Sequence, residues 1–453
     1  MISGSRLSRG WRSFCRLTVR VFYRRLEVAG LKNIPQDSGI LFCANHVNAL
    51  ADAVVMQAAT NRAIRPLARS GLFENPFLKP VLNMIGAVPI FRRQDAGVDT
   101  SNNQDTFAAC YELLAQHETL IIFPEGQSHS DPYLHELKTG AARIALGALE
   151  NNDQAPAVIP VGLTFVRKGS FRGDVLVYFG EPVDLSVEDG VDHHAAVKTV
   201  TQRITSGLKE VTINADSWQD IELLGQVQRF FALRQGKYQQ ARLTDKFEAL
   251  QRLIEGHKIL LEYEPDKVRS LVLHLRMFER LCKCCGIDNY QLTVDYQPLM
   301  IALYITRTIL IVVLGFPIAL WGLINSYVPF QLTRYLSRLV AKGKDQYDTS
   351  KMVLGIGFFT LFWGLQTAYI YINHGLWWAI GYFISLVVSA PVVLKMKHEY
   401  RLAWDNIKTF FLFLRRRQLK EYMRNKQKEI VVELAHLVRV AKRLTHQERL
   451  AEK

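Results

Sequence analysis

Two apolar stretches in the C-terminal part of the chain, residues 352–372 and 376–394, most constrain how the protein can fold. Each has about 20 residues, which is the length of an α-helix that crosses the roughly 30 Å hydrocarbon core of a bilayer. Asn373, His374 and Gly375 separate the two stretches. The pattern therefore predicts a helical hairpin that crosses a membrane and returns.

An earlier apolar stretch, residues 299–330, has two interpretations, because it is interrupted by Arg307 and by residues 315–317. If it crosses the membrane once, the basic loop and basic tail that follow lie opposite the N-terminal part of the chain. If it bends at residues 315–317, all three share one side, as the positive-inside rule favours. We therefore expect a re-entrant or broken helix. The basic loop contains Arg334, Arg338, Lys342 and Lys344.

The net charge of +14 favours an anionic partner: nucleic acid, a membrane surface or a phosphorylated substrate. Basic clusters lie beside the apolar stretches, so anionic lipid is the favoured partner. Nucleic-acid binding ranks last, since no RNA- or DNA-binding module is recognisable. The tail, residues 395–453, is expected to be a basic helix that lies along lipid headgroups or is simply solvated.

Residues 1–25 form an arginine-rich leader that ends before the first acidic residue, Glu27. The leader lacks the continuous apolar core of a secretory signal. We expect an amphipathic helix on the membrane surface, with an organelle transit peptide and an ordinary surface helix as alternatives. Its arginines are Arg6, Arg9, Arg12, Arg16, Arg20, Arg24 and Arg25.

The six cysteines form no extracellular disulfide framework and indicate a reducing compartment. Three of them cluster at Cys282, Cys284 and Cys285, where they could bind metal or be acylated. No second cluster of cysteine or histidine at ligand spacing accompanies them in the sequence, so a structural zinc is not favoured.

Between the leader and the membrane stretches, short apolar runs alternate with helical patterns. We expect strands at residues 39–44, 118–123, 157–165 and 175–179, and helices at 49–60, 104–116 and 137–149. This alternation predicts an α/β domain at residues 26–212, with a mixed sheet flanked by helices. A helical region at 213–297 and the membrane segment at 298–394 follow it.

The strand expected at residues 39–44 leads directly to His46, and Asp52 follows six residues later. A histidine at the carboxyl end of a strand is presented at the edge of the sheet. A nearby carboxylate can fix the tautomer of such a histidine and raise its basicity. The pair could therefore take a proton from a hydroxyl group.

Three further blocks follow in order, at residues 86–93, 123–128 and 158–162. Together with the His46 block they resemble the glycerol-phosphate acyltransferase superfamily, which includes the lysophosphatidate acyltransferases. Five residues separate His46 from Asp52, where the family usually has four. This spacing resembles the branch of the fungal glycerol-3-phosphate/dihydroxyacetone-phosphate acyltransferases and their bacterial relatives.

The resemblance implies His46 and Asp52 as the catalytic pair and Arg92 as the residue that holds the acceptor's phosphate. It also implies acceptor binding by Glu125, Gly126 and Ser128, although a buried glutamate that caps a turn is the alternative for Glu125. His129 and His135 are expected to be surface loop residues, since this chemistry needs no metal. The apolar residues between positions 73 and 82 are expected either to form a wall of the acyl-chain site or to belong to the ordinary hydrophobic core.

The implied activity is that of an integral membrane O-acyltransferase without a cofactor. Its co-substrate is a thioester, acyl-CoA or acyl carrier protein, and its acceptor is glycerol-3-phosphate or dihydroxyacetone phosphate. Acylation of lysophosphatidate or another lysolipid is one alternative, and a catalytically silent lipid-binding scaffold is another. The catalytic domain is expected on the cytoplasmic side of a bacterial inner membrane, or of the endoplasmic reticulum in a eukaryote.

Overall fold

The computed structural model describes residues 6–451 except 77, 92–102, 153, 189, 235–240, 288 and 293–297. The chain divides into two compact units. The first consists of Met1–Trp218, Arg242–Glu248 and Arg338–Met352, and the second of Gln219–Ala241, Ala249–Ser337 and Val353–Lys453. The first unit thus contains the predicted α/β domain and a short segment from much later in the chain.

In the described residues the first unit is built on one seven-stranded sheet with the order β1-β7-β6-β2-β5-β3-β4. Neighbouring strands run parallel except β6 and β7, which are antiparallel. The predicted mixed sheet is therefore confirmed. The strands are β1 (Arg25–Ala29), β2 (Ile40–Ala44), β3 (Ile64–Arg69), β4 (Val88–Ile90), β5 (Thr119–Ile122), β6 (Ala157–Phe165) and β7 (Asp174–Phe179).

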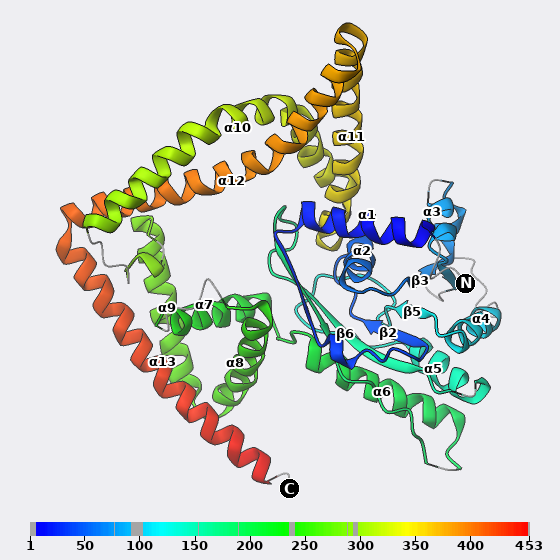
Figure 1. Ribbon diagram of the computed structural model, residues 1–453. Coiled ribbons are helices and arrows are strands. Elements are labelled where there is room, and N and C mark those ends of the chain that lie inside the picture. The colour runs from blue at the N-terminus through cyan, green and yellow to red at the C-terminus, as the bar shows by residue number, and fades with distance from the viewer. Residues whose placement is uncertain are drawn as a thin grey trace. The chain divides into compact units, whose positions relative to one another are not determined.

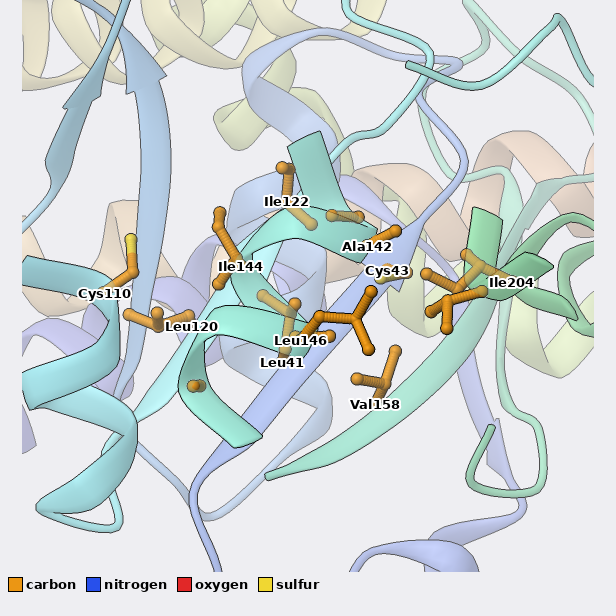
Figure 2. Packing of buried hydrophobic residues seen from close by; sticks show 14 of the residues in the cluster. Leu41, Cys43, Cys110, Leu120, Ile122, Ala142, Ile144, Leu146, Val158 and Ile204 are labelled. Atoms are coloured by element: carbon orange, nitrogen blue, oxygen red, sulfur yellow. The ribbon is translucent and has the colours of Figure 1, made fainter. Parts of the chain in front are cut away.

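Helices cover both faces of this sheet (Figure 1). On one face α1 (Arg6–Phe22) and α2 (Leu50–Ala59) pack over Ile40 and Phe42 of β2. On the other face α4 (Asn103–Ala115), α5 (Gly140–Asn151) and α6 (His193–Val211) pack over Leu41 and Cys43. Figure 2 shows Leu41 and Cys43 among the apolar side chains of that second cluster. Because β2 is buried on both faces, its sequence is a continuous apolar run.

The predicted helices agree with α2 and α4, and α5 begins three residues later than expected. The delay has a local cause: the N–H of Lys138 donates to the carbonyl of Pro124 at 2.7 Å, which keeps Lys138 out of the helix. The short helix α3 (Lys79–Met84) lies between β3 and β4. The strands β3 and β4 were not predicted, because each contains a proline in a short run.

The leader forms α1, whose Cys15, Val19 and Phe22 are buried on the first unit. Its exposed surface carries apolar side chains, among them Leu7, Phe14, Leu17 and Val21. Arginines stand between them, so this helix has an outer surface of mixed apolar and cationic character. Such a surface suits the headgroup region of an anionic bilayer.

In the second unit α7 (Trp218–Arg234), α9 (Pro265–Cys285) and α13 (Arg417–Ala451) share a core that includes Phe230, Phe278 and Leu434. The helix α8 (Leu243–Tyr263) precedes α9. The helical character expected for residues 213–297 is thus present in α7, α8 and α9. Cys282 is buried near the end of α9 and Cys284 is exposed.

Among the described residues, three helices are long and apolar enough to cross a membrane. They are α10 (Pro298–Val340), α11 (Tyr347–His374) and α12 (Leu376–Arg415). The predicted break at residues 315–317 is wrong, because α10 is continuous and curved, with Pro317 and Pro329 inside it (Figure 1). A proline removes one intrahelical hydrogen bond, and a long apolar helix can accept this loss by bending. Whether α10 crosses or returns stays a prediction.

We expect Gly162→Ala to destabilise the first unit. An alanine Cβ at this position of β6 would overlap the backbone carbonyl oxygen of Val211. Overpacking of this kind costs about 1–3 kcal/mol, and it should lower the melting temperature of the full-length protein in detergent. The control is Gly10→Ala in α1, where the added carbon would meet nothing within 4 Å beyond the backbone of its own helix. Equal melting temperatures for both variants would contradict this packing.

Candidate active site

His46 lies just beyond the carboxyl end of β2, where the sequence pattern expects it. The neighbouring strand β5 runs parallel to β2, so Phe123 and Glu125 leave the sheet at the same edge. The imidazole of His46 stacks on the ring of Phe123, with 4.1 Å between the centroids and 20° between the planes. The carboxyl ends of parallel strands are where α/β proteins place their ligands.

Asp52 holds the imidazole of His46 from the other side. Its Oδ2 lies 2.9 Å from His46 Nδ1 and also accepts the backbone N–H groups of Val47, at 2.9 Å, and Asn48, at 2.7 Å. The Asp52 side chain is 0% exposed, whereas that of His46 is 20% exposed. An ionised carboxylate only accepts hydrogen bonds, so Nδ1 carries the proton. Nε2 is then the ring nitrogen with a lone pair for a proton.

The five residues between His46 and Asp52 fold into a tight loop. Ala49 adopts a positive φ of 46° at the point where the loop enters α2, and Asp52 stands in the first turn of that helix. A carboxylate in the first turn of a helix is favoured by the helix dipole and by the free N–H groups there. The longer spacing therefore allows a direct contact between the two side chains.

Glu125 links the loop after β5 to the loop after β2. It is 3% exposed. Its Oε1 accepts the backbone N–H of His46 at 2.7 Å, and its Oε2 accepts that of His135 at 2.9 Å. These contacts are those of the turn-capping alternative, and the acceptor-binding role stays a prediction. The neighbouring Gly126 has a φ of 79°, a left-handed conformation that favours glycine.

The prediction of a surface position is wrong for His129, which is 8% exposed. Its Nε2 contacts Oε2 of Glu125, and its backbone N–H donates to the carbonyl of His46 at 3.1 Å. The buried carboxylate of Glu125 thus draws His129 inward. His135 is half-buried, and its ring stacks on that of His129.

Glu125, His129 and His135 could hold a metal ion by their spacing, since their ligand atoms lie within 4.8 Å of one another. In the structure these atoms already have protein partners: Glu125 accepts N–H groups, and Nε2 of His135 lies 2.8 Å from Oδ2 of Asp131. The polar atoms of this cluster thus have hydrogen-bond partners within the protein. The expectation that no metal is needed stays a prediction.

Ser128 donates its hydroxyl hydrogen to Oδ2 of Asp345 at 2.5 Å. Asp345 belongs to the late segment Arg338–Met352 of the first unit. Asp348 and Thr349 of this segment contact the loop between His46 and Asp52. We did not predict these three residues. In the sequence they stand out only as a pair of aspartates just before an apolar stretch. Such a pair does not indicate which residues it contacts.

Lys168 is a second group that the sequence analysis missed. Its Nζ donates to the carbonyl of His129 at 3.2 Å and to Oγ of Ser130 at 2.9 Å. Burial lowers the pKa of Lys168, and the charges of Asp52, Asp345, Asp348 and Asp131 oppose this shift. The lysine thus supplies positive charge beside a group of carboxylates.

Two predicted sites, the phosphate site and the acyl-chain wall, include residues that the structure does not describe. Arg92 lies outside the described residues, and so does Phe77 of the predicted acyl-chain wall. Of the remaining wall, Leu78 and Val81 are each more than one third exposed. The phosphate-binding role of Arg92 and the acyl-chain wall therefore stay predictions.

Comparison with known proteins points to the same part of the chain. Residues 25–164 match the family model described as Acyltransferase. Glycerol-3-phosphate O-acyltransferase 1 of Saccharomyces cerevisiae is 25% identical over 308 residues, which are 62% of this chain and 40% of that protein. Glycerol-3-phosphate O-acyltransferase 2 of the same yeast is 26% identical over 199 residues, 42% of this chain and 26% of that protein. The chain thus spans 40% or less of these relatives.

Among solved structures, the 1-acyl-sn-glycerophosphate acyltransferase PlsC from Thermotoga maritima is 22% identical to this chain. The match covers 45% of this chain and 78% of that one, with a TM-score of 0.34. A TM-score this low carries no weight for the fold or the site.

We expect Cys43, three residues before His46, to be unreactive in the folded protein. It is fully buried, and burial raises the pKa of its thiol, as it raises those of Cys15 and Cys110 to about 12. Only the thiolate reacts, so iodoacetamide at about pH 8 should alkylate the exposed Cys284 and spare Cys43. Mass spectrometry of native and denatured samples checks this. Equal labelling of both in the native protein would make Cys43 a candidate nucleophile.

Proposed function

Residues 25–164 are an acyltransferase domain of the glycerol-phosphate and lysophosphatidate acyltransferase superfamily, and from this premise we propose that the chain acylates a glycerol phosphate. The acyl group comes from acyl-CoA or from the thioester of acyl carrier protein. The acceptor is glycerol-3-phosphate or dihydroxyacetone phosphate, and the product is a phospholipid precursor. The names of the two yeast relatives support glycerol-3-phosphate, although the matched regions are a minor part of each relative.

The observation that carries the proposal is the hydrogen bond between Nδ1 of His46 and Oδ2 of Asp52, 2.9 Å long, at the carboxyl edge of the sheet. The bond leaves Nε2 of His46 as the atom that can take a proton. The imidazole cannot rotate freely, because Phe123 stacks on its face. A base with a fixed orientation and a partly exposed nitrogen suits proton removal from a hydroxyl group.

In the proposed reaction Nε2 of His46 takes the proton of the acceptor hydroxyl while the oxygen attacks the thioester carbonyl carbon. The negative charge of Asp52 stabilises the imidazolium that forms. When the tetrahedral intermediate collapses, the carbon–sulfur bond breaks and the imidazolium gives its proton to the departing thiolate. The products are an ester and a free thiol, and His46 is neutral again.

This transfer needs no acyl-enzyme, because both substrates react within one ternary complex. The two nearby candidates for a covalent nucleophile are poorly suited to that role. Cys43 is fully buried and its pKa is raised. The hydroxyl of Ser128 is engaged with Asp345.

We place the acyltransferase domain at the cytoplasmic face of a bacterial inner membrane, or of the endoplasmic reticulum in a eukaryote. Three candidate membrane helices among the described residues support attachment to a bilayer. The exposed apolar and basic side chains of α1 support contact with anionic headgroups. An acceptor that is soluble and an acyl chain that is not would then meet at the membrane surface.

We expect His46→Ala to abolish measurable acyl transfer. Membranes that contain the wild type or the variant would receive radiolabelled acyl-CoA and, separately, glycerol-3-phosphate, dihydroxyacetone phosphate or lysophosphatidate. Loss of a general base reduces the rate by about 100- to 10,000-fold. Labelled ester should form with the wild type alone, and most rapidly with glycerol-3-phosphate.

The other possible results of this assay distinguish the alternative functions. Preference for lysophosphatidate would assign the chain to the lysolipid alternative. Ester formation that survives His46→Ala would refute the proposed base. If folded wild type forms no ester from acyl-CoA or from acyl carrier protein thioesters, the proposed function is wrong and the silent scaffold is favoured.

We expect Asp52→Asn to lower kcat by about 100-fold or more with a small effect on the acceptor KM. The fully buried carboxylate touches His46 and backbone amides, so its loss changes the base and its tautomer rather than the acceptor site. The control is Asp37→Asn at an exposed aspartate. An Asp52→Asn variant that raises KM and keeps kcat would contradict this role.

A further inference from the structure

The segment Arg338–Met352 belongs to the same compact unit as the acyltransferase domain, although about 300 residues of chain separate it from His46. It connects α10 to α11, two of the candidate membrane helices. Its contacts with the domain are hydrogen bonds from polar side chains, together with burial of Met352 in the core under α1 and α2.

Asp348 makes the deepest of these contacts. Its side chain is 0% exposed, and its Oδ2 accepts hydrogen bonds from Nδ2 of Asn48 at 2.6 Å and from the hydroxyl of Tyr23 at 3.2 Å. The backbone N–H of the same Asn48 donates to Asp52 at 2.7 Å. One residue, Asn48, therefore joins Asp348 to the carboxylate that orients His46.

Thr349 contacts the loop at two further points. Its hydroxyl oxygen accepts the backbone N–H of Ala51 at 3.1 Å, and its hydroxyl hydrogen goes to the carbonyl of Asn48 at 3.1 Å. These groups lie within the five residues that separate His46 from Asp52. Asp348 and Thr349 thus hold the loop whose conformation sets the distance between the two catalytic side chains.

The same segment also reaches the loop after β5, which carries Glu125 and Ser128. Asp345 accepts the hydroxyl hydrogen of Ser128 at 2.5 Å. Lys168 bonds to His129 and Ser130 of that loop, and its positive charge interacts with Asp345 and Asp348. The segment is therefore in contact with the loop between His46 and Asp52 and with the loop that carries Ser128.

We infer that Asp348 and Thr349 are positioning residues for the His46–Asp52 pair, so that the connection between two membrane helices is a working part of the active site. This inference rests on the proposed function. Plain anchoring would not require such residues. A buried carboxylate costs free energy unless its hydrogen bonds are specific, and apolar side chains would anchor the segment at lower cost.

The test uses the full-length protein in membranes and four variants. Asp348→Ala leaves the side chain of Asn48 without its acceptor, and a small displacement of catalytic groups costs about 10- to 100-fold in rate. We expect that loss in kcat, with acceptor KM nearly unchanged. Asp348→Asn keeps an oxygen that accepts from Asn48 and should recover most of the activity. Asn48→Ala should match Asp348→Ala, and the double variant should be no worse than either.

The matched control is Lys342→Ala. Lys342 lies on the same segment, and its side chain is exposed. We expect wild-type kcat from this variant. Equal losses from Lys342→Ala and Asp348→Ala would mean that any change in the segment lowers kcat, and the inference would be wrong.

A second measurement does not depend on acyl transfer. Diethylpyrocarbonate modifies the free nitrogen of histidine, and mass spectrometry gives the rate at His46 relative to the exposed His193. A loosened loop should raise the relative rate at His46 several-fold in Asp348→Ala, and the rate should be unchanged in Lys342→Ala. If wild type fails to transfer acyl groups, the proposed function fails while this rate still decides the inference. Unchanged rates in Asp348→Ala and Asn48→Ala would overturn it.

Discussion

The buried carboxylate of Asp52 is the interaction on which the active-site region depends. Its Oδ2 accepts hydrogen bonds from Nδ1 of His46 and from the backbone N–H groups of Val47 and Asn48. A fully buried charge is tolerable only with such partners. The hydrogen bonds close the loop, start α2 and set the tautomer of the histidine. Loss of this carboxylate would therefore disturb local folding and proton transfer together.

The sheet supplies the second constraint, and the sequence predicted this part well. The apolar run of β2 and the apolar run of β5 each end at a polar motif, and parallel pairing brings the two ends together. This arrangement follows from local patterns, because strand alternation and helix periodicity are encoded within short windows. The positions of His46 and Glu125 at one edge were therefore predictable from the residues beside them.

Other features had no local signal. Asp348 and Thr349 stand 300 and 301 residues from Asn48, and nothing around them in the chain identifies Asn48 as their partner. His129 looked like a loop residue because its neighbours are polar, yet the carboxylate of Glu125 draws it inside. Long-range pairing of buried polar groups depends on the whole fold. The break predicted in α10 was wrong for the opposite reason. Pro317 is a local signal for a break, but the long apolar helix continues through it.

The contacts of Asp345 and Asp348 with the motif loops also bear on how the chain lies in a bilayer. Groups that touch lie on one side of a bilayer, so Ser128 and Asp345 share a side. Between Ser128 and Asp345 in the chain, α10 is the one described helix long and apolar enough to cross, and whether it crosses or returns stays a prediction. The connection between two candidate membrane helices therefore lies at the same face of a bilayer as the loops that carry His46 and Ser128.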